Sequence, residues 1–278
     1  KSEAELGRLH RVALLMKTNR RYAVRLFGPL LGVMLLAACA TPPAGGNGFD
    51  EINDPLEPMN RVIFSFNQFV DGLIFKPLAL MYRDILPPEI QDGIGGILET
   101  LRTPIVLAND LLQGDVNRAG ETLSRFAINA TVGLGGIIDV ATEMGLEGHN
   151  EDFGQTLAVW GSGEGMYLVL PLFGPSNPRD AIGMGVDTFL DPLHYYANTK
   201  QLLARTLVRG VDERAGVIDA LDEIERTSID YYATMRSLYR QHRDDLIRNG
   251  SPAPLIPIPS ISFDDFESPQ EEQAALVE

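Results

Sequence analysis

The stretch MNRVIFSFNQFVDGLIF, residues 59–75, decides the fold, because its apolar side chains recur with the period of an α-helix. On a helical wheel, one broad face holds Val62, Ile63, Phe66, Phe69, Val70, Leu73 and Ile74. The opposite face holds Asn60, Arg61, Ser65, Asn67, Gln68 and Asp71, with Phe64 and Phe75 intruding on it. The pattern predicts an amphipathic helix over 59–75, which we expect Pro77 to end or kink.

Helical spacing also dominates the chain beyond this segment. We predict helices over 88–101 and 103–113, split by Thr103-Pro104, and a helix over 116–131 that Asp115 caps. Further helices are expected over 179–190, 199–225 and 228–248. Residues 161–178 are rich in glycine and proline, which predicts an irregular loop with at most a short extended segment. The predicted fold class is therefore all-α with Gly/Pro-rich loops.

Upstream of the first helix, a short apolar run ends in Leu36-Ala37-Ala38-Cys39, and Cys39 is the only cysteine of the chain. A basic stretch precedes this run, and together they are typical of a bacterial lipoprotein signal, with cleavage before Cys39 and lipidation of its thiol. Residues 1–38 are therefore interpreted as a signal peptide, of which 1–15 are an upstream mis-start before Met16. Ala40 favours sorting to an outer membrane. The alternative is a chance apolar N-terminus on a cytosolic protein.

The mature chain has three expected parts. Residues 39–50 are interpreted as a flexible tether, 51–249 as the helical domain, and 250–278 as a Pro-rich, acidic, disordered tail. Residues 1–38 carry seven basic and two acidic side chains, so their removal takes the net charge from −15 to −20. A chain this acidic is unsuited to binding nucleic acid, because proteins bind the phosphate backbone through Lys and Arg side chains. One lipidated cysteine excludes structural disulfides.

A search for catalytic or metal-binding motifs is negative. His149, His194 and His242 show no metal-ligand spacing, and Ser162 lacks the glycines that flank a nucleophile elbow. The glycine-rich loops do not fit a dinucleotide fingerprint, so we interpret their glycines as turn and close-packing positions. We predict no enzymatic activity, no metal and no cofactor. The similar stretches Gly93-Ile94-Gly95-Gly96 and Gly133-Leu134-Gly135-Gly136 are too short to indicate duplication.

An ordered set of short motifs between residues 54 and 249 resembles the MlaA (VacJ) lipoprotein family. The set includes Asp54-Pro55-Leu56-Glu57-Pro58-Met59-Asn60-Arg61, Phe64-Ser65-Phe66-Asn67, Tyr82-Arg83-Asp84, Asn109-Asp110-Leu111-Leu112-Gln113-Gly114-Asp115, Arg125-Phe126-Ala127-Ile128-Asn129, Gly133-Leu134-Gly135-Gly136-Ile137-Ile138-Asp139-Val140-Ala141, Asp152-Phe153-Gly154-Gln155-Thr156-Leu157, Gly161-Ser162-Gly163, Leu170-Pro171-Leu172-Phe173-Gly174-Pro175, Arg179-Asp180 and Arg240-Gln241-His242-Arg243. Each motif alone is weak, but their order behind a lipidation signal is specific.

The resemblance implies a ring-like assembly of amphipathic helices embedded in one membrane leaflet. Such proteins remove mislocalised phospholipids from the outer leaflet of the outer membrane through a polar channel. The implied partners are phospholipid, the outer membrane, trimeric porins and a periplasmic MlaC-like carrier. The implied location is the outer membrane, lipid-anchored, with the domain in the region of the inner (periplasmic) leaflet. A non-catalytic envelope tether and a lipid hydrolase are the alternatives.

The resemblance also suggests two groups of site residues. The first, for channel gating or the lipid path, consists of Asp54, Pro55, Met59, Asn60, Asn67 and Asp71. In the family, changes around the position of Met59-Asn60 disturb gating; the usual pair there is Phe-Asn. The second group, expected to face the membrane, consists of Ile63, Phe66, Phe69, Val70, Leu73 and Ile74. The alternative for this second group is packing against the protein's own core.

Overall fold

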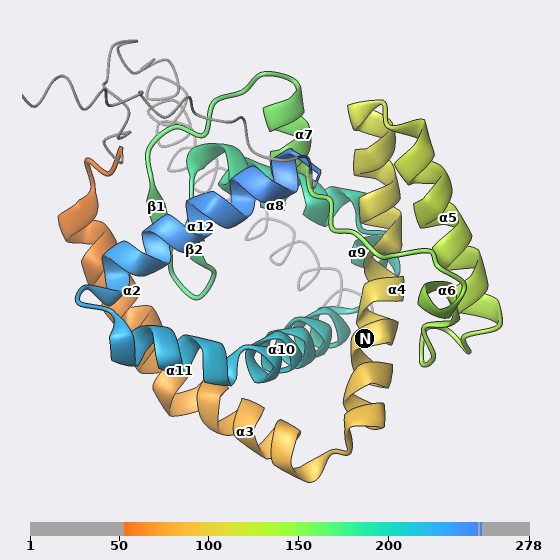
Figure 1. The fold of residues 1–278 in the computed structure, drawn as a ribbon, viewed down its shortest axis with the longest axis horizontal. Helices are drawn as coiled ribbons and strands as arrows, with labels where there is room; N and C mark the ends of the chain where they lie inside the picture. Colours follow the sequence, from red (N-terminus) through yellow and green to blue (C-terminus); the bar gives the residue numbers. More distant parts are fainter. Residues whose placement is uncertain (1–52, 250, 252–278) are drawn as a thin grey trace, which may run out of the picture.

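The computed structural model describes residues 53–249 and 251, and its helices follow one another around a ring (Figure 1). Cys39, the signal peptide, the tether and nearly all of the tail lie outside the described residues. The elements are α2 (Glu57–Val70), the π-helix η1 (Asp71–Phe75), α3 (Lys76–Ile85), α4 (Pro88–Gln113), α5 (Val116–Thr131), α6 (Val140–Glu143), α7 (Phe153–Val159), β1 (Leu168–Leu170), β2 (Gly174–Ser176), α8 (Pro178–Leu190), α9 (Leu193–Tyr196), α10 (Thr199–Gly216), α11 (Ile218–Thr227) and α12 (Tyr231–Ile247).

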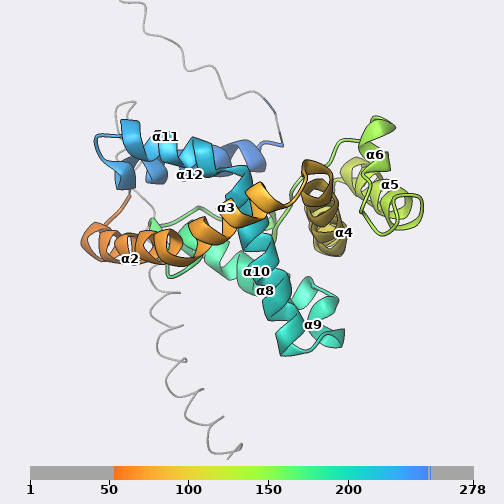
Figure 2. The same ribbon diagram turned by 90° about the horizontal axis from the view of Figure 1, so that it is seen from below.

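The all-α prediction is confirmed, with one small antiparallel hairpin in the described chain. Strands β1 and β2 pair with Val169 opposite Pro175, so the loop predicted over 161–178 holds two short strands where at most one was expected. Around the ring, α10 packs on α3 and α4, α5 on the outside of α4, and α7 on α8. Seen from below, α9 projects on one side of the ring, and α11 and α12 lie on the other (Figure 2).

The helix over 59–75 is confirmed, but Pro77 does not end it. The chain stays helical from Glu57 to Ile85, because the π-helix just before the proline changes the hydrogen-bond register. The Lys76 N–H donates to the Asp71 carbonyl, five residues back. A π turn of this kind absorbs the distortion that a proline without an N–H imposes on a helix.

Two other helix boundaries also differ from the predictions. The split at Thr103-Pro104 is wrong, because α4 runs through Pro104 and is held by α5, α7 and α10 along its length. The single helix over 199–225 is wrong as well, since the chain breaks at Val217 between α10 and α11. Next to this break, Ile218 is buried against Ala79. The helices predicted over 116–131, 179–190 and 228–248 are confirmed.

The glycines of the loops serve turns and close packing, as predicted: Gly161 and Gly165 have positive φ, whereas Gly133 and Gly136 lie against neighbouring backbone. A Cβ added to Gly96 would lie 2.1 Å from the Gly136 carbonyl oxygen, so α4 and the loop after α5 touch through backbone alone. Gly136 also has φ +99°, which a residue with a Cβ rarely adopts. The two similar Gly-x-Gly-Gly stretches are therefore packing partners.

The interior of the described residues contains two small apolar clusters and an unusual number of polar side chains. One apolar cluster joins Phe64, Tyr167, Val169 and Tyr232, and a second joins Ala79, Ala215 and Ile218. Buried polar and charged residues are at least as numerous as buried apolar ones, and they include Asn60, Asn109, Asp110, Glu151, Gln155 and Thr156. Among the described helices, none combines the length and the hydropathy needed to cross a membrane.

Candidate functional site

Helix α2 turns its apolar face outward. Phe66, Phe69, Leu73 and Ile74 of the predicted membrane-facing group are exposed, Phe69 to 66% and Leu73 to 63%. The other two are partly buried, and Ile63 packs against the Phe64 cluster. Soluble monomers rarely display such a row of aromatic and branched side chains. The face that carries Phe64 and Asn60 packs against the protein.

Two asparagines on the inner face of α2 bind the hairpin segment by the same device. The Asn60 amide donates to the Tyr167 carbonyl and accepts from the Val169 N–H, both at 3.0 Å. Seven residues later, Asn67 donates to the Leu170 carbonyl at 2.9 Å and accepts from the Leu172 N–H at 2.8 Å. Each carboxamide replaces the peptide group of a missing neighbouring strand, which satisfies backbone groups along β1.

Asp54 ties the start of the described chain to its last helix. Its carboxylate accepts from Asn60 Nδ2 at 2.8 Å, from the Tyr232 hydroxyl, and from Arg236 at 2.7 Å. Burial, the Asp54 hydrogen bond and the Asp54 charge together raise the pKa of the Tyr232 hydroxyl, so Tyr232 stays a donor at neutral pH. Asp54, Asn60 and α12 thus form one polar junction.

Of the remaining members of the predicted gating or lipid-path group, one makes an internal ion pair and two are exposed. Asp71 pairs with Arg214 on α10 through two contacts of 2.9 and 3.0 Å. This hydrogen-bonded pair raises the pKa of Arg214. Pro55 and Met59 are exposed, so the structure joins the four polar members to internal contacts and leaves the two apolar ones at the surface.

A second polar network, which the sequence analysis missed, connects α4, α5, α7 and α8. Asn109 donates to Asp187 at 3.0 Å and accepts from the Thr156 hydroxyl at 2.8 Å. Burial raises the pKa of the Asp187 carboxyl. The polar pairs inside the Asn109-Asp110 and Asp152–Thr156 motifs were the available signal, but helical spacing alone does not show that they are buried.

The same network continues through Asp110 and Glu151. Asp110 accepts from the Thr122 hydroxyl at 2.6 Å and lies 3.1 Å from His149 Nε2. Glu151 accepts from Gln113 at 2.7 Å and pairs with Arg118 at 3.1 Å, while burial raises the pKa of its carboxyl. Buried polar groups satisfied in this way fix the geometry of an interior that few apolar contacts support.

Exposed apolar side chains occur all around the ring and are not confined to α2. Besides those of α2 and η1, they include Leu78, Met81, Ile85, Ile90, Leu111, Val116, Leu123, Phe126, Val132, Leu134, Trp160, Phe173, Phe189, Tyr195 and Tyr196. Polar side chains fill much of the interior, and apolar ones cover much of the outside. So many exposed apolar side chains over so polar an interior are unusual for a water-soluble domain.

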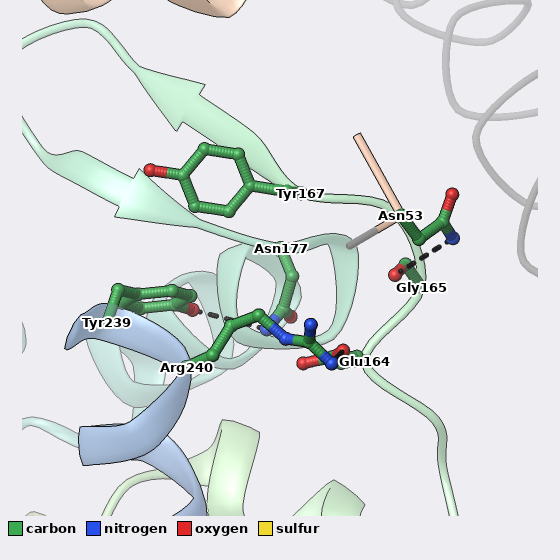
Figure 3. A pocket seen from close by; sticks show the side chains of 7 residues that line it. All are labelled: Asn53, Glu164, Gly165, Tyr167, Asn177, Tyr239 and Arg240. Atoms are coloured by element: carbon green, nitrogen blue, oxygen red, sulfur yellow. Dashed lines mark hydrogen bonds and ion pairs between the residues drawn. The ribbon is translucent and has the colours of Figure 1, made fainter. Parts of the chain in front are cut away.

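One small pocket lies where α12 meets the chain before β1 (Figure 3). Arg240 and Glu164 close one side with an ion pair of 2.8 Å, and the Tyr239 hydroxyl is 3.2 Å from Asn177 Nδ2. Most of its polar groups are thus already bonded to one another, although the Tyr167 hydroxyl has no partner among the described residues. No group of His, Cys, Asp and Glu side chains among the described residues could hold a metal ion.

Comparison with known proteins agrees with this architecture. The family model described as MlaA lipoprotein matches residues 52–246. The intermembrane phospholipid transport system lipoprotein MlaA of Escherichia coli is 34% identical over 233 residues, which are 82% of this chain and 90% of that protein. An uncharacterized protein of Rickettsia prowazekii is 35% identical over 199 residues, 71% of this chain and 79% of its own length.

A solved structure supports the same assignment. It addresses the structural basis for maintenance of bacterial outer membrane lipid asymmetry, and one of its chains superposes with a TM-score of 0.64 at 34% identity. The match covers 70% of this chain and 98% of that one. With the family model spanning the helical domain and relatives above 30% identity along most of the sequence, this chain belongs to the MlaA lipoprotein family.

Proposed function

We propose that this chain is an outer-membrane lipoprotein that removes mislocalised phospholipids from the outer leaflet through a polar channel and passes them to a periplasmic carrier. The observation that carries the proposal is the large number of apolar side chains exposed around a ring of helices. Exposed groups such as Phe69 and Leu73 are suited to contact with lipid, and buried polar groups such as Asn60 and Asn109 hold the helices in place through hydrogen bonds.

The physical need for such a ring comes from the lipid head group. A phospholipid that leaves its leaflet must keep a charged phosphate out of hydrocarbon, where an unpaired charge is very costly. Irregular, glycine-rich backbone is tolerated at membrane depth where it borders a polar cavity. The loop of residues 132–139, with positive φ at Leu134, Gly135 and Gly136, is irregular and glycine-rich in this way.

Within this proposal, Phe66, Phe69, Leu73 and Ile74 rest in the acyl chains of one leaflet, with Ile63 and Val70 at the edge of the protein core. Asp54, Pro55, Met59, Asn60, Asn67 and Asp71 affect the lipid path. For the polar four, the contacts support an indirect role: Asn60 and Asn67 hold α2 against the hairpin segment, Asp71 pairs η1 with α10, and Asp54 contacts α12.

The attachments and partners complete the proposal. The lipidated Cys39 anchors the chain, a trimeric porin accompanies it, and a soluble carrier similar to MlaC receives the lipid. The domain lies in the region of the periplasmic leaflet, and the chain moves lipid without breaking covalent bonds. The relatives named as components of an intermembrane phospholipid transport system support the transport role.

The decisive experiment measures the lipid asymmetry of the outer membrane in the source bacterium. Deletion of the gene is expected to raise the phosphatidylethanolamine that a membrane-impermeant amine reagent labels at the cell surface. A plasmid copy should restore the wild-type level, and a Cys39→Ser copy should not. Unchanged labelling after deletion contradicts the proposal. Lipid turnover by the purified protein that Ser162→Ala abolishes would instead favour the hydrolase alternative.

A further inference from the structure

Arg102 differs from every other arginine in the described part of the chain. The others each have a carboxylate partner: for example, Arg125 pairs with Glu99 and Asp139, Arg214 with Asp71, and Arg243 with Asp152. The half-buried Arg102 makes no ion pair with a described residue. Its contacts are long hydrogen bonds to neutral oxygens, Asn150 Oδ1 at 3.3 Å and the Glu151 carbonyl at 3.4 Å.

An unpaired cation is unexpected in this protein, because acidic residues outnumber basic ones by fifteen. Charges removed from water are normally paired, since an uncompensated buried charge destabilises a fold. Burial and the nearby Arg209 guanidinium lower the pKa of Arg102, whereas Asp152, Asp187 and Glu213 act in the opposite direction from longer range. The site therefore has a guanidinium but lacks the close counter-ion that stabilises one.

Arg102 also lines a pocket between α4, α5 and the loop before α7. Its other polar walls are Thr103, Thr122, Arg125, His149 and Asn150. Glu99 borders the same pocket, but its carboxylate pairs with Arg125 at 3.1 Å and not with Arg102. The pocket thus offers hydroxyl, amide and imidazole groups around one guanidinium that has hydrogen-bonding capacity to spare.

We propose that Arg102 and this pocket bind a phosphate group, supplied by a phospholipid head group or by free phosphate. The planar guanidinium presents paired N–H donors that match two oxygens of one phosphate. The NH2 group of Asn150, which lines the same pocket, is a further donor beside it. For the lipid source, the inference rests on the proposed transport function and places a head-group site in the wall of the ring, where α4 contacts α5 and α10 (Figure 1).

The test is binding to the full lipidated chain in a phosphate-free detergent. The probes are dihexanoylphosphatidylglycerol, inorganic phosphate and uncharged dihexanoylglycerol. Arg102→Gln should weaken binding of dihexanoylphosphatidylglycerol about tenfold, because hydrogen bonds to charged groups are the strong ones. Arg102→Lys should weaken it less, and dihexanoylglycerol binding should not change. The matched control, Arg83→Gln, removes a surface arginine paired with Asp219 and should leave all binding unchanged.

Each outcome has a defined meaning. An equal loss for inorganic phosphate supports a general phosphate site, and a loss confined to the phospholipid supports a head-group site. Equal affinities of wild type and Arg102→Gln for both phosphate probes overturn the proposal. The melting temperature of Arg102→Gln without ligand should equal or exceed that of wild type, and a clear fall would reveal a structural partner and also overturn it. Surface labelling in the deletion strain tests the transport function independently, so either proposal can fail alone.

Discussion

The Asn60 side chain binds the backbone at Val169 with the hydrogen bonds that a neighbouring β-strand would make. The Asn60 side chain is fully buried, and its Oδ1 accepts from the Val169 N–H while its Nδ2 donates to the Tyr167 carbonyl two residues earlier. A side chain of one helix thus provides both hydrogen bonds that a neighbouring strand would make. This contact attaches α2, with its apolar outer face, to the hairpin.

Asn60→Ala is expected to destabilise the protein by roughly 2–4 kcal/mol, because it leaves buried backbone groups of Tyr167 and Val169 without partners. Denaturant unfolding of the purified protein in detergent would measure this. Ser65→Ala is the matched control, since the exposed Ser65 hydroxyl bonds only to a carbonyl of its own helix. A loss no greater than that of the control would show that the hairpin does not depend on Asn60.

Phe66→Asp and Leu73→Asp are expected to loosen membrane seating without unfolding the protein, because both side chains are exposed. The effect should be clearest in a Cys39→Ser background, where the lipid anchor is absent, and fractionation of the cell envelope would measure it. Gln68→Asp, on the opposite face of the wheel, is the control. If the Phe66 and Leu73 variants still fractionate with the outer membrane without the anchor, α2 is not the seating element.

Gly96→Ala is expected to lower the melting temperature sharply, because its Cβ would lie 2.1 Å from the Gly136 carbonyl oxygen. The α4 backbone and the loop after α5 would have to separate. Gly120→Ala on α5 is the control, since nothing lies near the added Cβ and alanine is the better helix former by about 1 kcal/mol. Equal melting temperatures for the two variants would contradict the close packing.

Asp152 is expected to make the fold sensitive to acid. Burial raises the pKa of its carboxyl, but hydrogen bonds and charge from Arg243 outweigh this and hold the pKa at about 2. In the unfolded chain the value is about 3.9, so this carboxylate stabilises the fold above that pH and ceases to do so as the pH falls towards 2. Asp152→Asn should therefore flatten the unfolding free energy between about pH 5 and pH 2.

The control for this measurement is Asp84→Asn, because the Asp84 side chain is largely exposed and only weakly paired. Its unfolding free energy should follow the wild-type dependence on pH. An Asp152→Asn curve parallel to that of wild type over the same range would show that Asp152 does not link folding to protons.

Much of the fold could be predicted because the local spacing of apolar side chains indicates a helix. The N-cap of α5 is a clear case: Asp115 accepts from the Arg118 N–H at 3.0 Å, as its position predicts. The breaks between helices could not be predicted, since they depend on distant contacts. Pro104 stays inside α4 because α5, α7, α8 and α10 pack against that helix, and Pro77 is accommodated by a π turn that no sequence motif marks.

The candidate site could be predicted only in part, because periodicity separates the two faces of a helix without showing what covers each. Phe64 looked like an intrusion on the polar face of α2, yet it packs with Tyr167 and Tyr232 in the apolar cluster. The sequence likewise does not show which charged side chains pair with one another. The sequence shows fourteen arginines between residues 53 and 249, but only the spatial arrangement shows that Arg102 pairs with no carboxylate of the described residues.

The polar interior and the apolar exterior of the ring should tolerate substitution very differently. A hydrogen bond depends on angle and on the identity of both groups, so exchanging Asn60 or Asn109 for an apolar residue of similar volume loses its hydrogen bonds. In the proposed membrane seating, Phe69 contacts fluid acyl chains, where a side chain needs only to be apolar, so Phe69→Leu or Phe69→Ile should cost little. In a mutational scan, the residues that drift freely should therefore be the hydrophobic ones.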